Sequence, residues 1–173
     1  MDKIKVFCFG FGQVAESFTN KLINEKKDFD LSITSRQETH QIELNNIKIK
    51  SYQFTKEKFD SSIIKKLEDA DYILISIPPI DGEDIVTNFL EINQKNITNF
   101  KWITYLSATS VYGDHQGDWV NENSATKPSS PNGLSRLKAE KSWISLSKKN
   151  NYPLQIFRLA GIYSSEFNIL KRL

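Results

Sequence analysis

Two glycines near the amino terminus have the spacing of a loop that binds a diphosphate. Gly10 and Gly12 stand in the run Gly-Phe-Gly-Gln-Val-Ala, which has the form G-x-G-x-x-A and ends at Ala15. The first glycine of such a loop permits a tight turn, the second lets the backbone approach a pyrophosphate, and the small third residue lets the next helix pack closely. Amides at the start of that helix then face the anion. The pattern favours a dinucleotide site over an ordinary glycine turn, with these cofactor-binding residues: Gly10, Phe11, Gly12, Gln13 and Val14.

A second set of polar residues follows the next predicted strand, where nucleotide-binding folds distinguish NAD from NADP. Ser35 and Arg36 stand about 20 residues beyond the glycine loop. An acidic side chain there would accept the ribose hydroxyls of NAD, whereas a basic one would meet the additional phosphate of NADP. The planar guanidinium of Arg36 can hold a phosphate through two hydrogen bonds. We therefore expect Ser35 and Arg36 to bind the cofactor and to favour NADP, while the nearby Glu38 keeps NAD open.

Loops of this kind require a parallel sheet with crossover helices to position them. Short apolar runs alternate with segments of helical period, which is typical of a doubly wound α/β sheet. In that fold, ligands bind beyond the carboxyl ends of the strands, so we also expect Ser76, Ile77 and Pro78 beside the cofactor. The predicted strands are Ile4–Phe9, Leu31–Thr34, Ile47–Tyr52, Tyr72–Ile77, Trp102–Ser107 and Leu154–Leu159. The predicted helices are Gln13–Lys26, Phe59–Leu67, Ile85–Ile92 and Ser135–Lys148.

Length and composition predict one globular domain. The chain has 173 residues, of which 39% are hydrophobic and 25% are charged, which excludes collagen-like and disordered classes. A net charge of +2 indicates neither a nucleic acid nor a membrane as partner. Cys8 is the sole cysteine, so an internal disulfide and a thiolate metal site are excluded, and no apolar run reaches the roughly 20 residues that cross a bilayer. We expect a cytoplasmic protein that uses no metal.

Three further blocks resemble a known enzyme family. They are Tyr105–Gly113 (YLSATSVYG), Pro131–Glu140 (PNGLSRLKAE) and Arg158–Tyr163 (RLAGIY). Together with the glycine loop they resemble the extended short-chain dehydrogenase/reductase family of NAD(P)-dependent sugar epimerases and dehydratases, and most of all its atypical bacterial branch. The similarity runs from Ile4 to about Tyr163. It implies a Rossmann fold, an NAD(P) cofactor and a hydroxylated, sugar-nucleotide-like substrate.

The three residues that carry the chemistry in active members of this family are replaced. Where the family has Ser or Thr, Tyr and Lys, this chain has Ala108, Asn132 and Arg136. An amide cannot act as a general acid or base near neutral pH, so Asn132 could orient a hydroxyl but could not take its proton. Arg136 keeps a positive charge and could still hold a ribose or a phosphate, so it is a candidate for both catalysis and cofactor binding. The other catalytic candidates are Ser107, Thr109 and His115.

The resemblance also implies a further lobe. Members of the family continue for roughly another hundred residues, which form a smaller substrate-binding lobe. We therefore expect residues 1–173 to be a single NAD(P)-binding domain, shorter than the family's chains, with apolar surface that favours self-association. Two functions stay open: an NADP-dependent oxidoreductase or epimerase-like enzyme with a rearranged proton relay, and a non-catalytic dinucleotide sensor that reports the cofactor to a partner.

Overall fold

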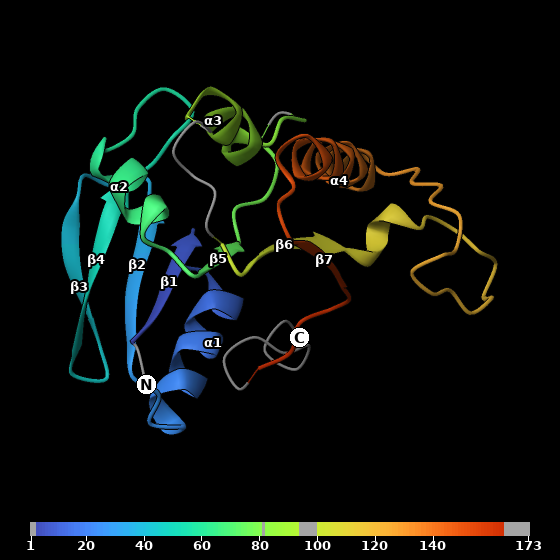
Figure 1. Ribbon diagram of the computed structural model, residues 1–173. Coiled ribbons are helices and arrows are strands. Elements are labelled where there is room, and N and C mark those ends of the chain that lie inside the picture. Colours follow the sequence, from blue (N-terminus) through green and yellow to red (C-terminus); the bar gives the residue numbers. More distant parts are fainter. Residues whose placement is uncertain (1–2, 81, 94–99, 165–173) are drawn as a thin grey trace.

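The chain folds around a seven-stranded sheet in the order β3-β4-β2-β1-β5-β6-β7 (Figure 1). The computed structural model describes residues 3–80, 82–93 and 100–164. All neighbouring strands are parallel except β3 and β4, so the sheet without β3 has the doubly wound order, and the predicted fold class is confirmed. The strands are β1 (Ile4–Phe9), β2 (Phe29–Ser35), β3 (His40–Leu44), β4 (Ile47–Gln53), β5 (Tyr72–Ile75), β6 (Trp102–Ala108) and β7 (Leu154–Leu159). The helices are α1 (Gln13–Asn24), α2 (Ser62–Glu68), α3 (Ile85–Asn93) and α4 (Pro131–Asn150).

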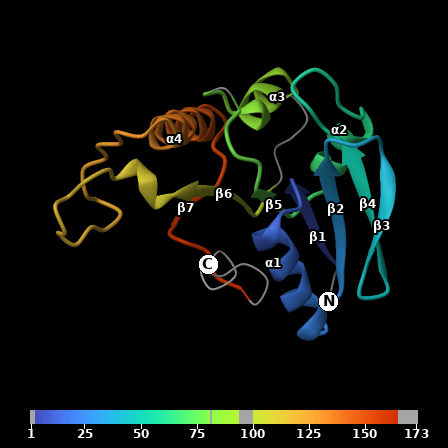
Figure 2. The same cartoon turned by 180° about the vertical axis from the view of Figure 1, so that it is seen from behind.

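The two faces of the sheet carry different helices. Successive side chains of a strand point to opposite faces. Phe7 and Phe9 of β1 accordingly belong to the core shared with α2, α3 and α4, while Val6 and Cys8 belong to the core shared with α1. The view from behind also shows α1 alone on its side, with α3 and α4 on the other (Figure 2). Trp143 of α4, which is 1% exposed, is the largest side chain buried in the first core.

The edge strand β3 has no counterpart among the predicted strands. It pairs antiparallel with β4 through a tight turn at Asn45 and Asn46, whose φ angles are +49° and +63°. Asparagine tolerates this left-handed backbone better than most residues, and two such residues in succession suit a two-residue hairpin. A hairpin therefore stands where doubly wound folds usually place a crossover helix, and the chain still enters β4 parallel to β2.

Helix α4 begins four residues before its predicted start at Ser135. Pro131 occupies the first turn, where its missing N–H costs no hydrogen bond, and Ser130 Oγ accepts a hydrogen bond from the amide of Gly133 at 3.1 Å. Gly133 also lies so close to the chain after β6 that an added Cβ would meet the carbonyl oxygen of Ser110 at 2.5 Å. The earlier start places Asn132 in the first turn of the helix.

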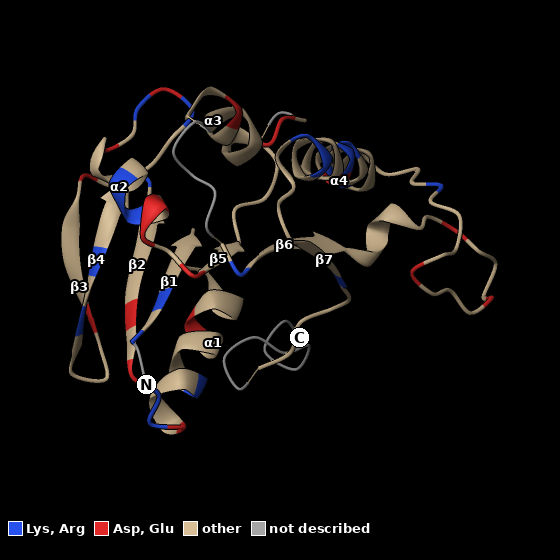
Figure 3. Ribbon diagram, in the orientation of Figure 1, with Lys and Arg blue, Asp and Glu red and all other residues tan. Residues whose placement is uncertain are grey.

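Charged side chains of both signs are spread over the elements (Figure 3). The exposed side of α4 is basic, because its one acidic residue, Glu140, is 1% exposed. The exposed lysines of this helix are Lys138, Lys141, Lys148 and Lys149. Within the described part of the chain, no helix combines the length and the apolar character needed to cross a membrane.

Candidate functional site

The turn between β1 and α1 is built for close backbone contact. Gly10 has a φ of +83°, which residues with a side chain rarely adopt. A Cβ on Gly10 would stand 2.9 Å from Cγ1 of Ile77, so glycine lets the turn touch the loop after β5. The amide of Gly10 donates to Thr34 Oγ1 at 2.8 Å, which ties the turn to β2. The carboxyl ends of β1, β2 and β5 therefore meet at the predicted phosphate loop.

The start of α1 has polar groups without hydrogen-bond partners beside Gly12. Gly12 precedes the helix in an extended conformation and supplies no side-chain cap. A Cβ at Gly12 would meet nothing nearer than Ser76 Oγ at 3.8 Å, so this glycine borders open space. The Nε2 atom of Gln13 is buried and has no hydrogen-bond partner among the described residues. A buried unpaired donor and an uncapped helix start both fit an anionic ligand such as a diphosphate.

The other predicted cofactor residues lie at the same edge of the sheet. Ser76 follows β5, and its amide donates to the carbonyl oxygen of Phe9 at 2.8 Å. At the end of β2, Ser35 Oγ accepts a hydrogen bond from Ser51 Oγ at 3.0 Å, and the next residue, Arg36, is exposed. Thr34 was not among the predicted site residues. Thr34 ends the predicted strand Leu31–Thr34, and a hydroxyl at that position, close to the glycine loop, is the sequence signal that could have identified it.

The residues at the end of β6 differ in exposure. Ser107 is 3% exposed, and its hydroxyl donates to Glu140 Oε1 at 2.6 Å. Ala108 ends the strand, and Thr109 begins the short 3-10 turn η2 (Thr109–Val111) with an exposed side chain. Of the two hydroxyls predicted as catalytic, that of Thr109 is accessible, whereas that of Ser107 already serves a buried carboxylate.

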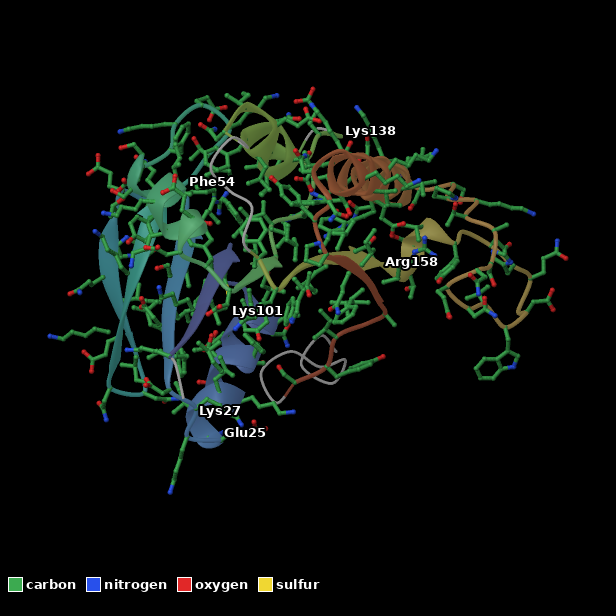
Figure 4. The ribbon with its side chains drawn as sticks, in the orientation of Figure 1. Glu25, Lys27, Phe54, Lys101, Lys138 and Arg158 are labelled. Carbon is green, nitrogen blue, oxygen red and sulfur yellow. The ribbon has the colours of Figure 1, made fainter. Side chains whose placement is uncertain are left out.

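Glu140 and Arg158 form an ion pair that joins α4 to β7. The Nε and Nη2 atoms of Arg158 donate to the two carboxylate oxygens of Glu140 at 3.0 and 2.8 Å. These hydrogen bonds raise the pKa of Arg158 above its usual range. The guanidinium also lies over the ring of Tyr112, 4.8 Å from its centroid, where β7 approaches α4 (Figure 4). Because Ser107 also donates to Glu140, one carboxylate connects β6, α4 and β7.

The first turns of α4 hold two of the replaced family positions, Asn132 and Arg136. Asn132 is exposed, and Arg136 Nη1 donates to the carbonyl oxygen of Leu106 in β6 at 2.6 Å. The side chain of Tyr105 is fully buried nearby, and burial, with a smaller contribution from the charge of Asp84, raises its pKa to about 12. Tyr105 therefore stays protonated at neutral pH and does not replace the tyrosine that the family resemblance implies.

His115 lies in the β6–α4 loop, which comprises residues 112–130. Its Nε2 atom is 3.1 Å from the carbonyl oxygen of Ala125, and its ring packs edge-on against Tyr112 at 6.4 Å between centroids. One ring nitrogen thus holds the two sides of the loop together. A catalytic role for His115 stays a prediction.

Solved structures of sugar-nucleotide enzymes share this architecture. UDP-glucuronic acid 4-epimerase from Bacillus cereus, in complex with NAD, superposes with a TM-score of 0.73 at 17% identity, over 92% of this chain and 57% of its own. UDP-N-acetylglucosamine 4-epimerase from Bacillus cereus gives 0.72 at 20% identity, over 98% and 66%. A functionally unknown conserved protein from Silicibacter pomeroyi gives 0.73 at 28% identity, over 93% and 54%. The chain has a Rossmann fold.

These similarities stop at the fold. No protein-family model and no curated protein matches the sequence. The chain spans 57% and 66% of the lengths of these two epimerases, so their substrates and activities are not carried over with the fold.

Removing the carboxylate of Glu140 tests whether the ion pair supports the fold. Glu140→Ala leaves Arg158 without its partner and Ser107 without its acceptor. We expect the free energy of unfolding to fall by about 3 kcal/mol, near the low end for a broken buried pair. The low end applies because the Arg158 side chain is still 21% exposed.

Urea unfolding measures the change. The matched control, Glu91→Ala on the exposed side of α3, should change stability by less than about 0.5 kcal/mol. Equal effects of the two substitutions would contradict this role.

Proposed function

We propose that this protein binds a nicotinamide dinucleotide at the crevice where β1, β2 and β5 end. The observation that carries the proposal is the uncapped start of α1. Gly12 borders open space there, and the buried side-chain Nε2 of Gln13 has no hydrogen-bond partner among the described residues. The backbone amides of Gln13 and Val14 would donate hydrogen bonds to the diphosphate, and the partial positive charge at the start of the helix would add to this attraction. When bound, a nicotinamide dinucleotide supplies hydride transfer.

The same crevice favours NADP over NAD. The exposed guanidinium of Arg36 follows β2, at the position where a basic side chain meets the additional phosphate of NADP. Ser35 precedes Arg36 in the chain, and its hydroxyl accepts a hydrogen bond from Ser51, so it keeps its own proton to donate to a phosphate. The loop formed by Ser76, Ile77 and Pro78 would flank the cofactor on the other side.

A dinucleotide-binding module without the family's proton transfer agrees best with the geometry. Asn132 cannot take a proton, Arg136 donates to the backbone of β6, and the hydroxyl of Ser107 serves Glu140. Thr109, at the end of β6, has an exposed side chain. We infer that the protein binds the cofactor and reports its presence to a partner.

The second candidate is an oxidoreductase or epimerase-like enzyme that acts on a sugar-nucleotide-like molecule. Two observations favour it: the exposed hydroxyl of Thr109 at the end of β6, and the fold shared with UDP-sugar 4-epimerases. Thr109 could donate a hydrogen bond to a substrate hydroxyl, and the imidazole of His115 lies in the adjoining loop.

Filling the open space at Gly12 tests the binding site. Gly12 has an extended backbone that valine also adopts, and a side chain there meets no close neighbour. We expect Gly12→Val to keep the fold but to weaken the binding of NADPH and NADH about tenfold or more, because the side chain blocks the approach of the diphosphate. Fluorescence titration measures the affinities, and thermal unfolding verifies the fold. Unchanged affinity for both cofactors in a folded variant would refute the site.

Reversing the charge of Arg36 tests the choice of cofactor. We expect Arg36→Glu to weaken NADPH roughly 10- to 100-fold, as the loss of a charged hydrogen bond to a phosphate does, and to leave NADH nearly unchanged. Lys148→Glu reverses an exposed charge in the last turn of α4 and is the matched control, with no expected effect on either cofactor. An equal loss for NADPH and NADH would contradict the assignment of Arg36 to the phosphate.

Turnover separates the two candidate functions. We expect the protein to bind NADPH without oxidising it in the presence of carbonyl compounds and UDP-sugars, because Asn132 stands where the family has its tyrosine and an amide cannot act as a general acid. Absorbance at the reduced-nicotinamide band follows cofactor oxidation, and product analysis follows epimerisation. Turnover that disappears in Thr109→Val would instead establish the enzyme.

A further inference from the structure

The turn between β1 and α1 is held from both neighbouring strands. On the β5 side, the amide of Ser76 donates to the carbonyl oxygen of Phe9 at 2.8 Å. On the β2 side, the amide of Gly10 donates to the side-chain hydroxyl oxygen of Thr34 at 2.8 Å. The first hydrogen bond joins two backbone groups and does not depend on the identity of a side chain. The second does, so the side chain of Thr34 decides whether the turn is held against β2.

Thr34 supplies an acceptor at the point where the ladder between β1 and β2 stops. The pairing of these strands ends at Cys8 and Ile33, so the amide of Gly10 lies beyond the last pair. This amide is partly buried and therefore needs an acceptor, because a buried donor without a partner is costly. The hydroxyl of threonine or serine can accept the hydrogen bond, whereas valine has nearly the shape of threonine and no acceptor.

The position of Thr34 makes its influence on a ligand indirect. Thr34 is 1% exposed, and so is Tyr52, its register partner in β4. A role in binding therefore passes through Gly10, whose amide the hydroxyl contacts. Gly12, which follows Gly10 in the same turn, is the N-cap of α1 and borders open space. A displaced turn would move the first amides of α1 away from the place that we assign to the diphosphate.

We propose that Thr34 is a positioning residue for dinucleotide binding, because its hydroxyl fixes the backbone turn that leads into α1. This role rests on the proposed function, since it concerns the same diphosphate site. It acts on the diphosphate, which NADPH and NADH share, and not on the additional phosphate that we assign to Arg36. Loss of the hydroxyl therefore weakens both cofactors by the same factor and leaves the preference between them unchanged.

Removing the hydroxyl is the first test. We expect Thr34→Val to weaken NADPH and NADH about tenfold each in fluorescence titrations, because displaced amides make poorer hydrogen bonds to the diphosphate. Thr34→Ser keeps the acceptor and should bind both cofactors within about threefold of the wild type. The matched control, Thr104→Val, makes the same change at a strand threonine that is 3% exposed in β6, and should leave both affinities unchanged. A folded Thr34→Val variant with wild-type affinity, or an equal loss in Thr104→Val, overturns the role.

Stability provides a readout that separates positioning from packing. Thr34→Ser removes a buried methyl group, so we expect its unfolding midpoint in urea to fall below that of the wild type while its cofactor affinity persists. A role in packing alone would make affinity follow stability. Thr34→Ser would then lose binding together with its methyl group, and that result would contradict the proposal.

Hydrogen exchange tests the contact in the absence of any cofactor. The amide of Gly10 should exchange about tenfold or more faster in Thr34→Val than in the wild type or Thr34→Ser, because only the latter two keep its acceptor. Equal exchange in all three proteins would show that Thr34 does not hold the turn. If exchange differs as expected but the wild type binds neither NADPH nor NADH, the proposed function is wrong although Thr34 holds the turn. If the wild type binds both and Thr34→Val binds them equally well, the function stands and the role of Thr34 is overturned.

Discussion

The backbone of Gly10 packs closely on Ile77, so the carboxyl ends of β1, β2 and β5 lie side by side. Its left-handed φ permits the turn, and its hydrogen bond to Thr34 fixes the turn against β2. Helix α1 begins directly after this turn at Gln13, with Gly12 as its N-cap, and its first amides face the crevice between the strand ends. A side chain at Gly10 would meet the side chain of Ile77 and would strain the left-handed backbone of the turn.

Helix α4 is the second element that decides what this crevice can do. In the family that the sequence resembles, the start of this helix carries a tyrosine and a lysine for proton transfer. Here the same helix donates from Arg136 to the backbone of β6 and accepts from Ser107 through Glu140. These side chains stabilise the junction of helix and strand. The Rossmann fold is therefore present, while Arg136, Glu140 and Ser107 hold helix α4 against the sheet.

The parts of the structure that could be predicted are those encoded locally. The glycine spacing and the apolar runs predicted the turn between β1 and α1 and the parallel strands, because each signal lies within a few residues. The early start of α4 also had a local signal, since Ser130 followed by Pro131 is a common helix start. By contrast, Glu140 meets Arg158 18 residues away and Ser107 33 residues away. No periodicity links positions so far apart, so the ion pair became visible only in the folded chain.

The position of Cys8 has a practical consequence for the study of this fold. Its side chain has no exposure at the centre of the sheet, and burial raises its pKa to about 12, so it meets neither condition for alkylation while the protein is folded. Because β1 pairs with both β2 and β5, exposing the thiol requires the sheet itself to open. Since Cys8 is the sole cysteine, the rate of its labelling under native conditions reports the rare openings of the whole domain without any engineered probe.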